Sequence, residues 1–215
     1  DSRSVLTEYE AKQIFTVCDI PVNEGALVST TENAVKYFRT SSGAVAMKIV
    51  SPQIIHKTDA GCVLLNVHEE QAVVQSFEEL MANAKRFDPQ ADIHGVLIQE
   101  MIGASGIEVI IGASRDETFG PVLMFGLGGI FVESIRDVTF RAAPLTPADA
   151  LAMIRDIRGY KVLEKAGISE LKLAGILLKV SALVEQFKEI QELDLNPLFA
   201  DSHGVTAADA RILLD

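Results

Sequence analysis

A histidine in polar, turn-prone sequence is the first feature of this chain that could carry chemistry. His56 lies in the run S-P-Q-I-I-H-K-T-D at residues 51–59, directly after an apolar segment. Imidazole is a nucleophile near neutral pH and can form a covalent intermediate that divides one difficult transfer into two easier ones. We therefore consider His56 as a phosphoryl carrier. A single loop histidine is more often a plain surface residue, so this interpretation depends on the residues around it.

A lysine inside an apolar segment is the second candidate. Lys48 lies within residues 44–50, where the other side chains are Ala, Val, Met and Ile. Burying an ammonium group is costly unless an anion pairs with it, and a phosphate would supply that anion. The alternative is a lysine that extends from the strand edge to water, which is the commoner case when nothing else is known.

Polar side chains at the ends of two further apolar segments could bind a nucleoside. Gln99 and Glu100 end one strand-like run, where a carboxylate and backbone groups could bond a purine edge or ribose hydroxyls. Glu108 begins the next apolar run, so its charge also needs a partner. Taken alone, each carboxylate is more often a strand cap that faces solvent.

The segment E-L-D-L-N-P-L at residues 192–198 is a sharper signal. Alternation along a strand places Asp194 and Asn196 on one face, and Asp209 follows thirteen residues after Asn196. Oxygen ligands from Asn196 and Asp209, completed by water and phosphate oxygens, would suit Mg²⁺. A nearby carboxylate such as Asp194 could fix the tautomer of His56. Turn chemistry, which also favours Asn-Pro and Asp, explains the segment equally well.

These residues need elements that position them, and the apolar patterns predict such elements. Thr7 and Glu10 form a capping-box pattern that predicts a helix at residues 7–18. Helices are predicted at residues 7–18, 31–40, 69–87, 146–158 and 168–190, and strands at residues 25–29, 44–50, 62–67, 93–102, 107–113, 137–142, 192–195 and 198–200. The glycine-dense residues 120–133 predict strands interrupted by a flexible hinge. This alternation predicts an α/β fold with helices covering a sheet.

Composition excludes several classes of protein. The net charge of −11 is a poor match to a nucleic-acid backbone. Cys18 and Cys62 provide neither a disulfide framework nor a metal-type spacing, which favours a reducing cytoplasm. No apolar stretch reaches the roughly 18 residues of a membrane helix. We therefore expect a soluble, cytoplasmic protein that binds neither nucleic acid nor membrane.

In combination, these motifs resemble a known family. The chain is similar to the nucleotide-binding β subunit, or fused domain, of the NDP-forming acyl-CoA synthetases, in particular ADP-forming acetyl-CoA synthetase, within the ATP-grasp superfamily. The resemblance rests on an ordered series that covers nearly the whole chain: residues 6–12, 47–49, 51–59, 106–112, 124–133 and 192–198.

The resemblance implies a two-lobed ATP-grasp fold of the α/β (α+β) class. It implies one domain over residues 1–215, with one lobe at residues 20–97 and the other formed by residues 1–19 with 98–215. It also implies ATP/ADP and Mg²⁺ as cofactors, with site residues as follows: Lys48 on the phosphates, Gln99, Glu100 and Glu108 around adenine and ribose, Asn196 and Asp209 on Mg²⁺, and Asp194 facing a phosphohistidine.

The resemblance further implies a relay. Acyl-CoA and phosphate give an acyl phosphate, whose phosphoryl group passes to a histidine of a CoA-binding subunit and then to ADP. His56 matches the histidine on the ATP-grasp side that acts as a second carrier. No CoA-binding segment is recognisable here, so the reaction would need a CoA-binding α subunit or a fused CoA-binding domain.

Two positions depart from the family pattern. Cys62 follows Gly61 where the family usually has a second glycine. Residues 163–169 lack the Gly-x-Arg-Gly element that usually precedes the long helix. The second departure favours an alternative, a regulatory ligand-sensing domain of a fused protein acetyltransferase with little or no turnover. A scaffold without a nucleotide site is a third reading, but it leaves Lys48 and Glu108 unexplained.

Overall fold

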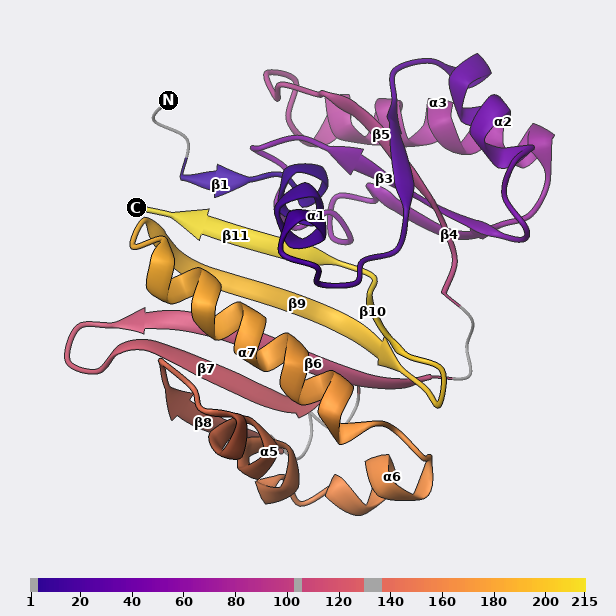
Figure 1. Cartoon of the computed structure of the whole chain (residues 1–215). Coiled ribbons are helices and arrows are strands. Elements are labelled where there is room, and N and C mark those ends of the chain that lie inside the picture. The colour runs from indigo at the N-terminus through magenta and orange to yellow at the C-terminus, as the bar shows by residue number, and fades with distance from the viewer. Residues whose placement is uncertain (1–3, 103–105, 130–136) are drawn as a thin grey trace. The chain divides into compact units, whose positions relative to one another are not determined.

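The structure is a computed structural model, which describes residues 4–102, 106–129 and 137–215. The chain divides into two compact units. Unit 1 combines Asp1–Val22 with Gly103–Asp215, and unit 2 is Asn23–Ile102. Unit 2 is therefore an insertion into the sequence of unit 1. Each unit is built on its own antiparallel sheet (Figure 1).

Unit 2 has four strands in the order β2-β5-β3-β4 and two helices. Its elements are β2 (Gly25–Val28), α2 (Thr31–Phe38), β3 (Val45–Val50), β4 (Val63–Val67), α3 (Glu70–Phe87) and β5 (Gly95–Glu100). Apolar residues three to four positions apart on α3, such as Val73, Phe77 and Leu80, pack with Met47 and Ile49 of β3 in one core. Lys48, between these two strand residues, therefore points to the other face of the sheet.

Unit 1 holds a larger sheet in the order β1-β11-β9-β6-β7-β8, with β10 paired to β9. Its elements are β1 (Val5–Leu6), α1 (Glu8–Val17), β6 (Ile107–Asp116), β7 (Gly120–Leu127), β8 (Val138–Ala142), α5 (Pro147–Asp156), α6 (Tyr160–Lys165), α7 (Glu170–Gln186), β9 (Ile190–Ala200), β10 (Val205–Ala207) and β11 (Ala210–Leu214).

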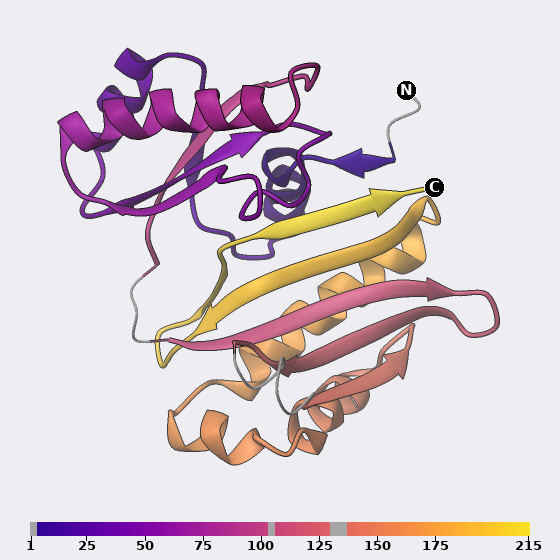
Figure 2. The same cartoon turned by 180° about the vertical axis from the view of Figure 1, so that it is seen from behind.

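The helices of unit 1 cover one face of its sheet. Phe15 of α1, Met153 of α5 and Leu177 of α7 share a core with Phe125 and Leu195 of the strands. Figure 1 shows α7 running across this face, and Figure 2 shows the opposite face of the unit 1 sheet without a helix of that unit. Polar residues that alternate with the core residues of the strands therefore project from a helix-free face.

Local sequence explains where α1 begins. Thr7 Oγ1 accepts a hydrogen bond from the Glu10 amide at 3.3 Å, and Glu10 Oε2 accepts one from the Thr7 amide at 2.8 Å. These reciprocal bonds satisfy two amides that have no partner inside the helix. The capping box predicted from the sequence is confirmed. Outside residues 190–200, the predicted helices and strands are present as well, with ends shifted by a few residues.

Four features of the prediction were wrong or incomplete. The two strands predicted at residues 192–195 and 198–200 are one strand, β9. Asn196 and Pro197 lie opposite Ile110 alone, where the register with β6 shifts, so the missing Pro197 amide costs no ladder hydrogen bond. The helix predicted at residues 168–190 ends at Gln186. The strands β1, β10 and β11 were not predicted, and neither was the helix α6.

The glycine-dense segment is described only in part. Its first residues form β7, which pairs with β6 and β8. Residues 130–133, the last four of the segment, lie outside the described residues, so the hinge stays a prediction. No helix in residues 4–102, 106–129 or 137–215 has the length and apolar composition that crossing a membrane requires.

Candidate functional site

The helix-free face of the unit 1 sheet carries the polar residues of β9. Leu193 and Leu195 are buried in the core. Asp194 and Asn196 alternate with them and project from the other face, with Asp194 half-buried and Asn196 exposed. The predicted placement of Asp194 and Asn196 on one strand face is therefore present in the structure.

Asp194 has a different neighbouring residue on each of its two sides. It pairs with Gly112 on β6 and with Arg211 on β11. A Cβ atom at Gly112 would lie 3.9 Å from Asp194 Oδ1 and 3.2 Å from Met124 Cε. Glycine thus leaves space beside the carboxylate on the β6 side, while a guanidinium supplies positive charge from the β11 side.

Burial has the largest effect on the pKa of Asp194. Desolvation raises the pKa of this carboxyl above its ordinary value, and the nearby charges of Glu192 and Asp209 raise it further. Arg211 and a hydrogen bond from Asn196 oppose that rise. The guanidinium is shared, because Arg211 Nη2 also donates to Glu192 Oε2 at 3.2 Å. The result is a polar cluster whose charges depend on one another.

Asp209 completes this cluster at the start of β11. Ala210 pairs with Leu195, so the preceding Asp209 lies level with the Asn196 end of β9. Asp209 Oδ1 accepts a hydrogen bond from the Ala210 amide at 2.7 Å. Among the described residues, no three His, Cys, Asp or Glu side chains gather closely enough to hold a metal. Asn196 and Asp209 are oxygen donors of the kind Mg²⁺ prefers, but they supply only part of a coordination sphere.

Glu108 lies on the same strand face, near the start of β6, and it fits closely against two glycines. Its carbonyl accepts a hydrogen bond from the Gly128 amide at 2.7 Å. A Cβ atom at Gly128 would lie 2.8 Å from Glu108 Cβ, and one at Gly129 would lie 3.1 Å from Glu108 Oε2. Gly129 also has φ +61°, which disfavours other residues. The glycines after β7 therefore allow a close approach to Glu108.

Unit 2 brings Lys48 and Gln99 to one face of its sheet. They lie on the paired strands β3 and β5, where Lys48 pairs with Leu97 and Gln99 pairs with Ala46. Their exposed fractions are 6% and 2%, so both polar groups are buried. Both residues also interact with other groups of the protein, which compensates for the burial of their polar atoms.

Glu100 does not join Lys48 and Gln99. Alternation places its side chain on the other face of β5. Glu100 Oε1 accepts a hydrogen bond from the Ser42 amide at 2.8 Å, and Oε2 accepts one from Ser42 Oγ at 3.2 Å. Both carboxylate oxygens of Glu100 thus bind the turn before β3.

His56 lies on an exposed loop of unit 2. The His56 carbonyl accepts from the Ala60 amide at 3.2 Å, and the Lys57 carbonyl accepts from the Cys62 amide at 2.7 Å, so the following turn is hydrogen-bonded. Cys62, the first departure from the family pattern, is fully buried in the unit 2 core. Burial raises the pKa of its thiol. The residue that replaces glycine therefore packs inward.

The second departure lies at α6. Asp137 accepts hydrogen bonds from the Arg158 and Gly159 amides, each at 2.7 Å, directly before this short helix. Tyr160 Oη donates to Glu170 Oε1, and Arg155 Nη2 donates to Glu170 Oε2 at 2.7 Å. These two bonds hold the pKa of Glu170 below its ordinary value, the Arg155 bond having the larger effect. Side chains of α5, α6 and α7 thus bond to one another on both sides of the segment that lacks the Gly-x-Arg-Gly element.

Several residues of the cluster were missed by the sequence prediction. Gly112 and Arg211 flank Asp194 from β6 and β11, whose pairing with β9 is not visible locally, whereas Glu192 lies two residues before Asp194 on β9 itself. One signal was available: Arg211 stands two residues after Asp209, between alanine and isoleucine, as expected for the polar face of a strand.

Comparison with known proteins agrees with this architecture. The protein-family model described as the ATP-grasp domain matches residues 1–214 of this chain. The chain is 46% identical over 213 residues to the β subunit of ADP-forming acetate–CoA ligase I from Pyrococcus furiosus, covering 97% of this chain and 91% of the relative. It is 40% identical to the ADP-forming acetate–CoA ligase of Methanocaldococcus jannaschii, covering 96% of this chain but 30% of that longer protein.

A solved structure gives the same result. The acetyl-coenzyme A synthetase 1 of Candidatus Korarchaeum cryptofilum superposes with a TM-score of 0.93 at 41% identity, covering 100% of this chain and 95% of the matched chain. The fold class and the family resemblance predicted from the sequence are therefore confirmed. The chain belongs to the ATP-grasp family and, within it, to the ADP-forming acetate–CoA ligases, whose separate β subunits it matches over nearly their whole length.

Proposed function

We propose that the chain is the ATP/ADP-binding half of an ADP-forming acyl-CoA ligase and passes phosphoryl between a phosphohistidine and ADP. The observation that carries this proposal is the match to β subunits of acetate–CoA ligases over 91% of their length. Lys48 and Gln99 on one face of the unit 2 sheet, and Glu108, Asp194 and Asn196 on one face of the unit 1 sheet, support it. A CoA-binding α subunit, or a fused domain, supplies the acyl-CoA chemistry.

We assign nucleotide-binding roles to residues of each unit separately. Lys48 binds phosphate oxygens through its ammonium group, and Gln99 offers both donor and acceptor atoms to an adenine edge. Glu108 accepts from ribose hydroxyls. Glu100 supports this region through its bonds to Ser42 and contributes backbone rather than carboxylate atoms. The structure of the Korarchaeum synthetase holds Ca-AMPCP in one complex and Mg-AMPPCP in another, which supports a nucleotide with a divalent cation.

Asn196 and Asp209 are the residues that would hold Mg²⁺. Their oxygen donors fit the ion, and nucleotide phosphates and water would complete its coordination. Bound Mg²⁺ would neutralise charge on the phosphates during transfer. Asp194 accepts a hydrogen bond from an imidazole N–H and so orients the ring for attack on phosphorus. In this step the N–P bond forms as the bond from phosphorus to its leaving oxygen breaks, and the reverse step delivers phosphoryl to ADP.

His56 is the residue of this chain that we assign as the second phosphoryl carrier. Its place on an exposed loop makes the imidazole accessible. One of the Korarchaeum structures has its phosphohistidine segment pointing towards the nucleotide-binding site, which supports a histidine relay in that protein. In our proposal, His56 accepts the phosphoryl group from the partner's histidine and then transfers it to ADP.

Phosphohistidine labelling tests the carrier role. The chain is incubated with Mg²⁺ and γ-labelled ATP, with and without its CoA-binding partner, and the two chains are then separated. We expect acid-labile, base-stable label on this chain that is lost in His56→Ala. The exposed His68 is the matched control in the same unit, and His68→Ala should keep the label.

One feature of the sequence favours a second candidate function. The segment from α6 to Ser169 contains no arginine, unlike the usual family pattern. A regulatory domain that binds nucleotide without turnover would fit this departure. Nucleotide binding without label on this chain, in either condition, would contradict the carrier role and support the regulatory function.

A further inference from the structure

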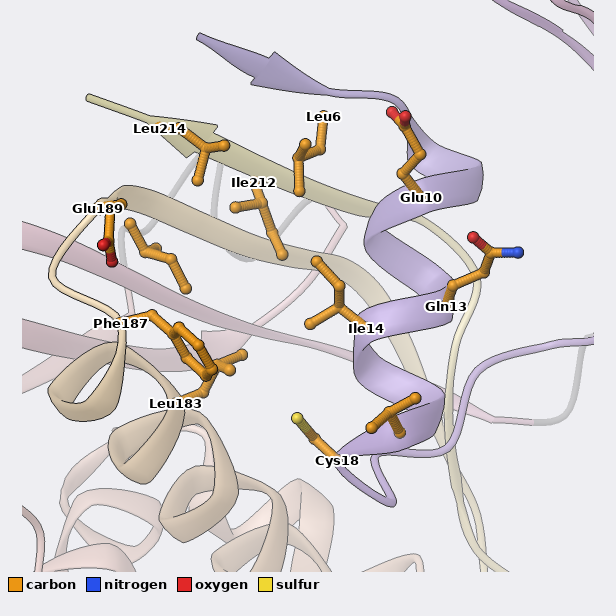
Figure 3. A pocket seen from close by; sticks show the side chains of 12 residues that line it. Leu6, Glu10, Gln13, Ile14, Cys18, Leu183, Phe187, Glu189, Ile212 and Leu214 are labelled. Atoms are coloured by element: carbon orange, nitrogen blue, oxygen red, sulfur yellow. The ribbon is translucent and has the colours of Figure 1, made fainter. Parts of the chain in front are cut away.

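Unit 1 has an apolar groove on the helix-covered side of its sheet (Figure 3). Its volume is about 630 Å³, within the size range of binding pockets. We call it the α1–α7 groove. Its apolar side chains come from α1, the end of α7 and β11, and they include Ile14, Cys18, Leu183, Phe187, Ile212 and Leu214.

The rim of the α1–α7 groove exposes large apolar side chains. Val17 is 86% exposed and Phe187 is 46% exposed, and both line the groove. Single exposed apolar residues are normal on a protein surface. Here the exposed side chains border a concave apolar surface, and such a combination is typical of an interaction site. The groove is therefore suited to receive apolar anchors from another molecule.

The charged residues of the groove have one sign. Glu10 and Glu189 are its only charged lining residues among those that the structure describes. The Glu10 carboxylate is fixed, because Thr7 donates to Glu10 Oε2 from its amide and from its hydroxyl, each at 2.8 Å. Glu189 is exposed near the opposite end of the groove (Figure 3). Because Glu189 is exposed, apolar anchors that bind beside it should be flanked by positive charge.

These charges select among possible occupants. A second copy would bring the same glutamates, and the chain has a net charge of −11, so self-association through this groove is disfavoured. A fatty acid would bring its carboxylate against the same two glutamates. A polypeptide segment with leucine-like anchors and flanking lysine or arginine satisfies both the apolar floor and the acidic rim, in the manner of a helix bound in a groove.

We propose that the α1–α7 groove docks such a basic, apolar segment of the CoA-binding partner. This inference rests on the proposed function, which requires that partner. The groove lies on the helix-covered side of the unit 1 sheet, whereas Asp194 and Asn196 project from the helix-free face. A segment bound in the groove therefore leaves the polar face of the unit 1 sheet uncovered.

Affinity for the purified CoA-binding subunit, or for the CoA-binding domain expressed as a separate chain, tests the proposal. Val17→Ser and Phe187→Ser remove exposed apolar anchors, and each should raise the Kd about tenfold or more in calorimetric titration. Leu171→Ser is the matched control, because Leu171 is 75% exposed on α7 but does not line the groove. Unchanged affinity in both groove variants would overturn the proposal.

Charge reversal tests the acidic rim separately. Glu189→Lys should raise the Kd at low salt, and the effect should shrink at high salt because salt screens exposed charges. Glu185→Lys introduces the same charge at an exposed position of α7 outside the groove, and it should leave the Kd within about twofold. Equal effects of the two reversals would indicate nonspecific attraction and contradict docking in the groove.

The rate of cysteine alkylation reports whether the α1–α7 groove is occupied. Cys18 lines the groove and is partly exposed, whereas Cys62 is fully buried and serves as an internal control. Saturating partner should slow alkylation of Cys18 in the folded protein, and an unchanged rate in a formed complex would contradict the proposal. Nucleotide binding is measured in parallel. Wild type that binds partner but not nucleotide would refute the proposed function, while groove variants with unchanged partner affinity would refute the docking site.

Discussion

Asp194 on β9 and Gly112 on β6 lie directly opposite each other, and the missing side chain at Gly112 leaves space beside the Asp194 carboxylate. A methyl group there would contact mainly Met124 Cε, the flexible end of a side chain, at 3.2 Å. A branched side chain would extend toward Asp194 Oδ1. The identity of residue 112 therefore controls access to the carboxylate.

We expect Gly112→Ala to keep phosphoryl transfer near the wild-type rate and Gly112→Val to lower it by about tenfold or more, since a displaced catalytic group loses its alignment. Overpacking should also cost the valine variant about 1–3 kcal/mol of unfolding free energy. Single-turnover labelling and urea unfolding measure the two effects. A valine variant that transfers phosphoryl normally would show that Asp194 does not need this space.

Replacing Gly159 and Gly175 by alanine should change the unfolding free energy in opposite directions. A Cβ atom at Gly159 would lie 2.2 Å from Leu127 Cδ1, and Leu127 is buried in the core. Gly159→Ala should therefore lower the unfolding free energy by about 1–3 kcal/mol. A Cβ atom at Gly175, inside α7, would meet nothing within 4 Å. Gly175→Ala should raise stability by about 0.5–1 kcal/mol, because alanine is the better helix former.

Urea unfolding midpoints of the two alanine variants check this prediction under identical conditions. Equal shifts in both would mean that the close approach at Gly159 is relieved elsewhere in the fold. Asp137 Oδ2, which would lie 3.0 Å from the new methyl group, is the neighbour whose bond to the Gly159 amide would be disturbed.

The bonds to Glu170 predict a pH dependence. Because Arg155 and Tyr160 hold the pKa of Glu170 below its ordinary value, the folded state binds fewer protons at this site than the unfolded state. The resulting stabilisation is present above the unfolded pKa, about 4.3, and is lost as pH falls through the folded pKa. Wild type should exceed Glu170→Gln in stability at about pH 7, and the difference should shrink toward pH 3.

Urea titrations of wild type and Glu170→Gln at several pH values measure this difference, because the other carboxyl groups are common to both proteins. A difference that stays constant with pH would mean that the carboxylate charge of Glu170 contributes no more than a neutral amide. The partners, Arg155 and Tyr160, are unchanged in both proteins.

Lys48→Met tests the buried ammonium group. Methionine keeps the length and apolar character of the side chain but removes the charge that we assign to phosphate binding. Affinity for Mg-ADP should fall about 10- to 100-fold, the value of one or two hydrogen bonds to a charged group. Lys36→Met makes the same charge change at an exposed position of α2 in the same unit and should bind normally. Calorimetry that finds equal losses in both variants would contradict the role of Lys48.

The elements that sequence patterns predicted well are those with local causes. The capping box at Thr7 and the alternation around Asp194 each depend on a few neighbouring residues, and both are present in the structure. The continuity of β9 through Pro197 was missed because it depends on a bulge opposite β6. Arg211 was missed because only the pairing of β11 with β9 brings it to Asp194.

Roles of individual residues were harder to predict than their positions. Glu100 looked equivalent to Gln99 in the sequence, yet its carboxylate binds Ser42 on the other face of β5. Cys62 was noted in the sequence only as a replacement for glycine, but its thiol packs in the core. In both cases the direction of the side chain, which depends on tertiary packing, decides what the residue can do.

The pairing of β1 with β11 determines when the protein can finish folding. Val5 lies opposite Leu213, so the sheet of unit 1 joins residues from both ends of the chain. During synthesis, β1 leaves the ribosome before β11 and must wait for it before it has a partner, whereas all strands of unit 2 are consecutive in the sequence. Unit 2 can therefore assemble while translation continues, and unit 1 closes last.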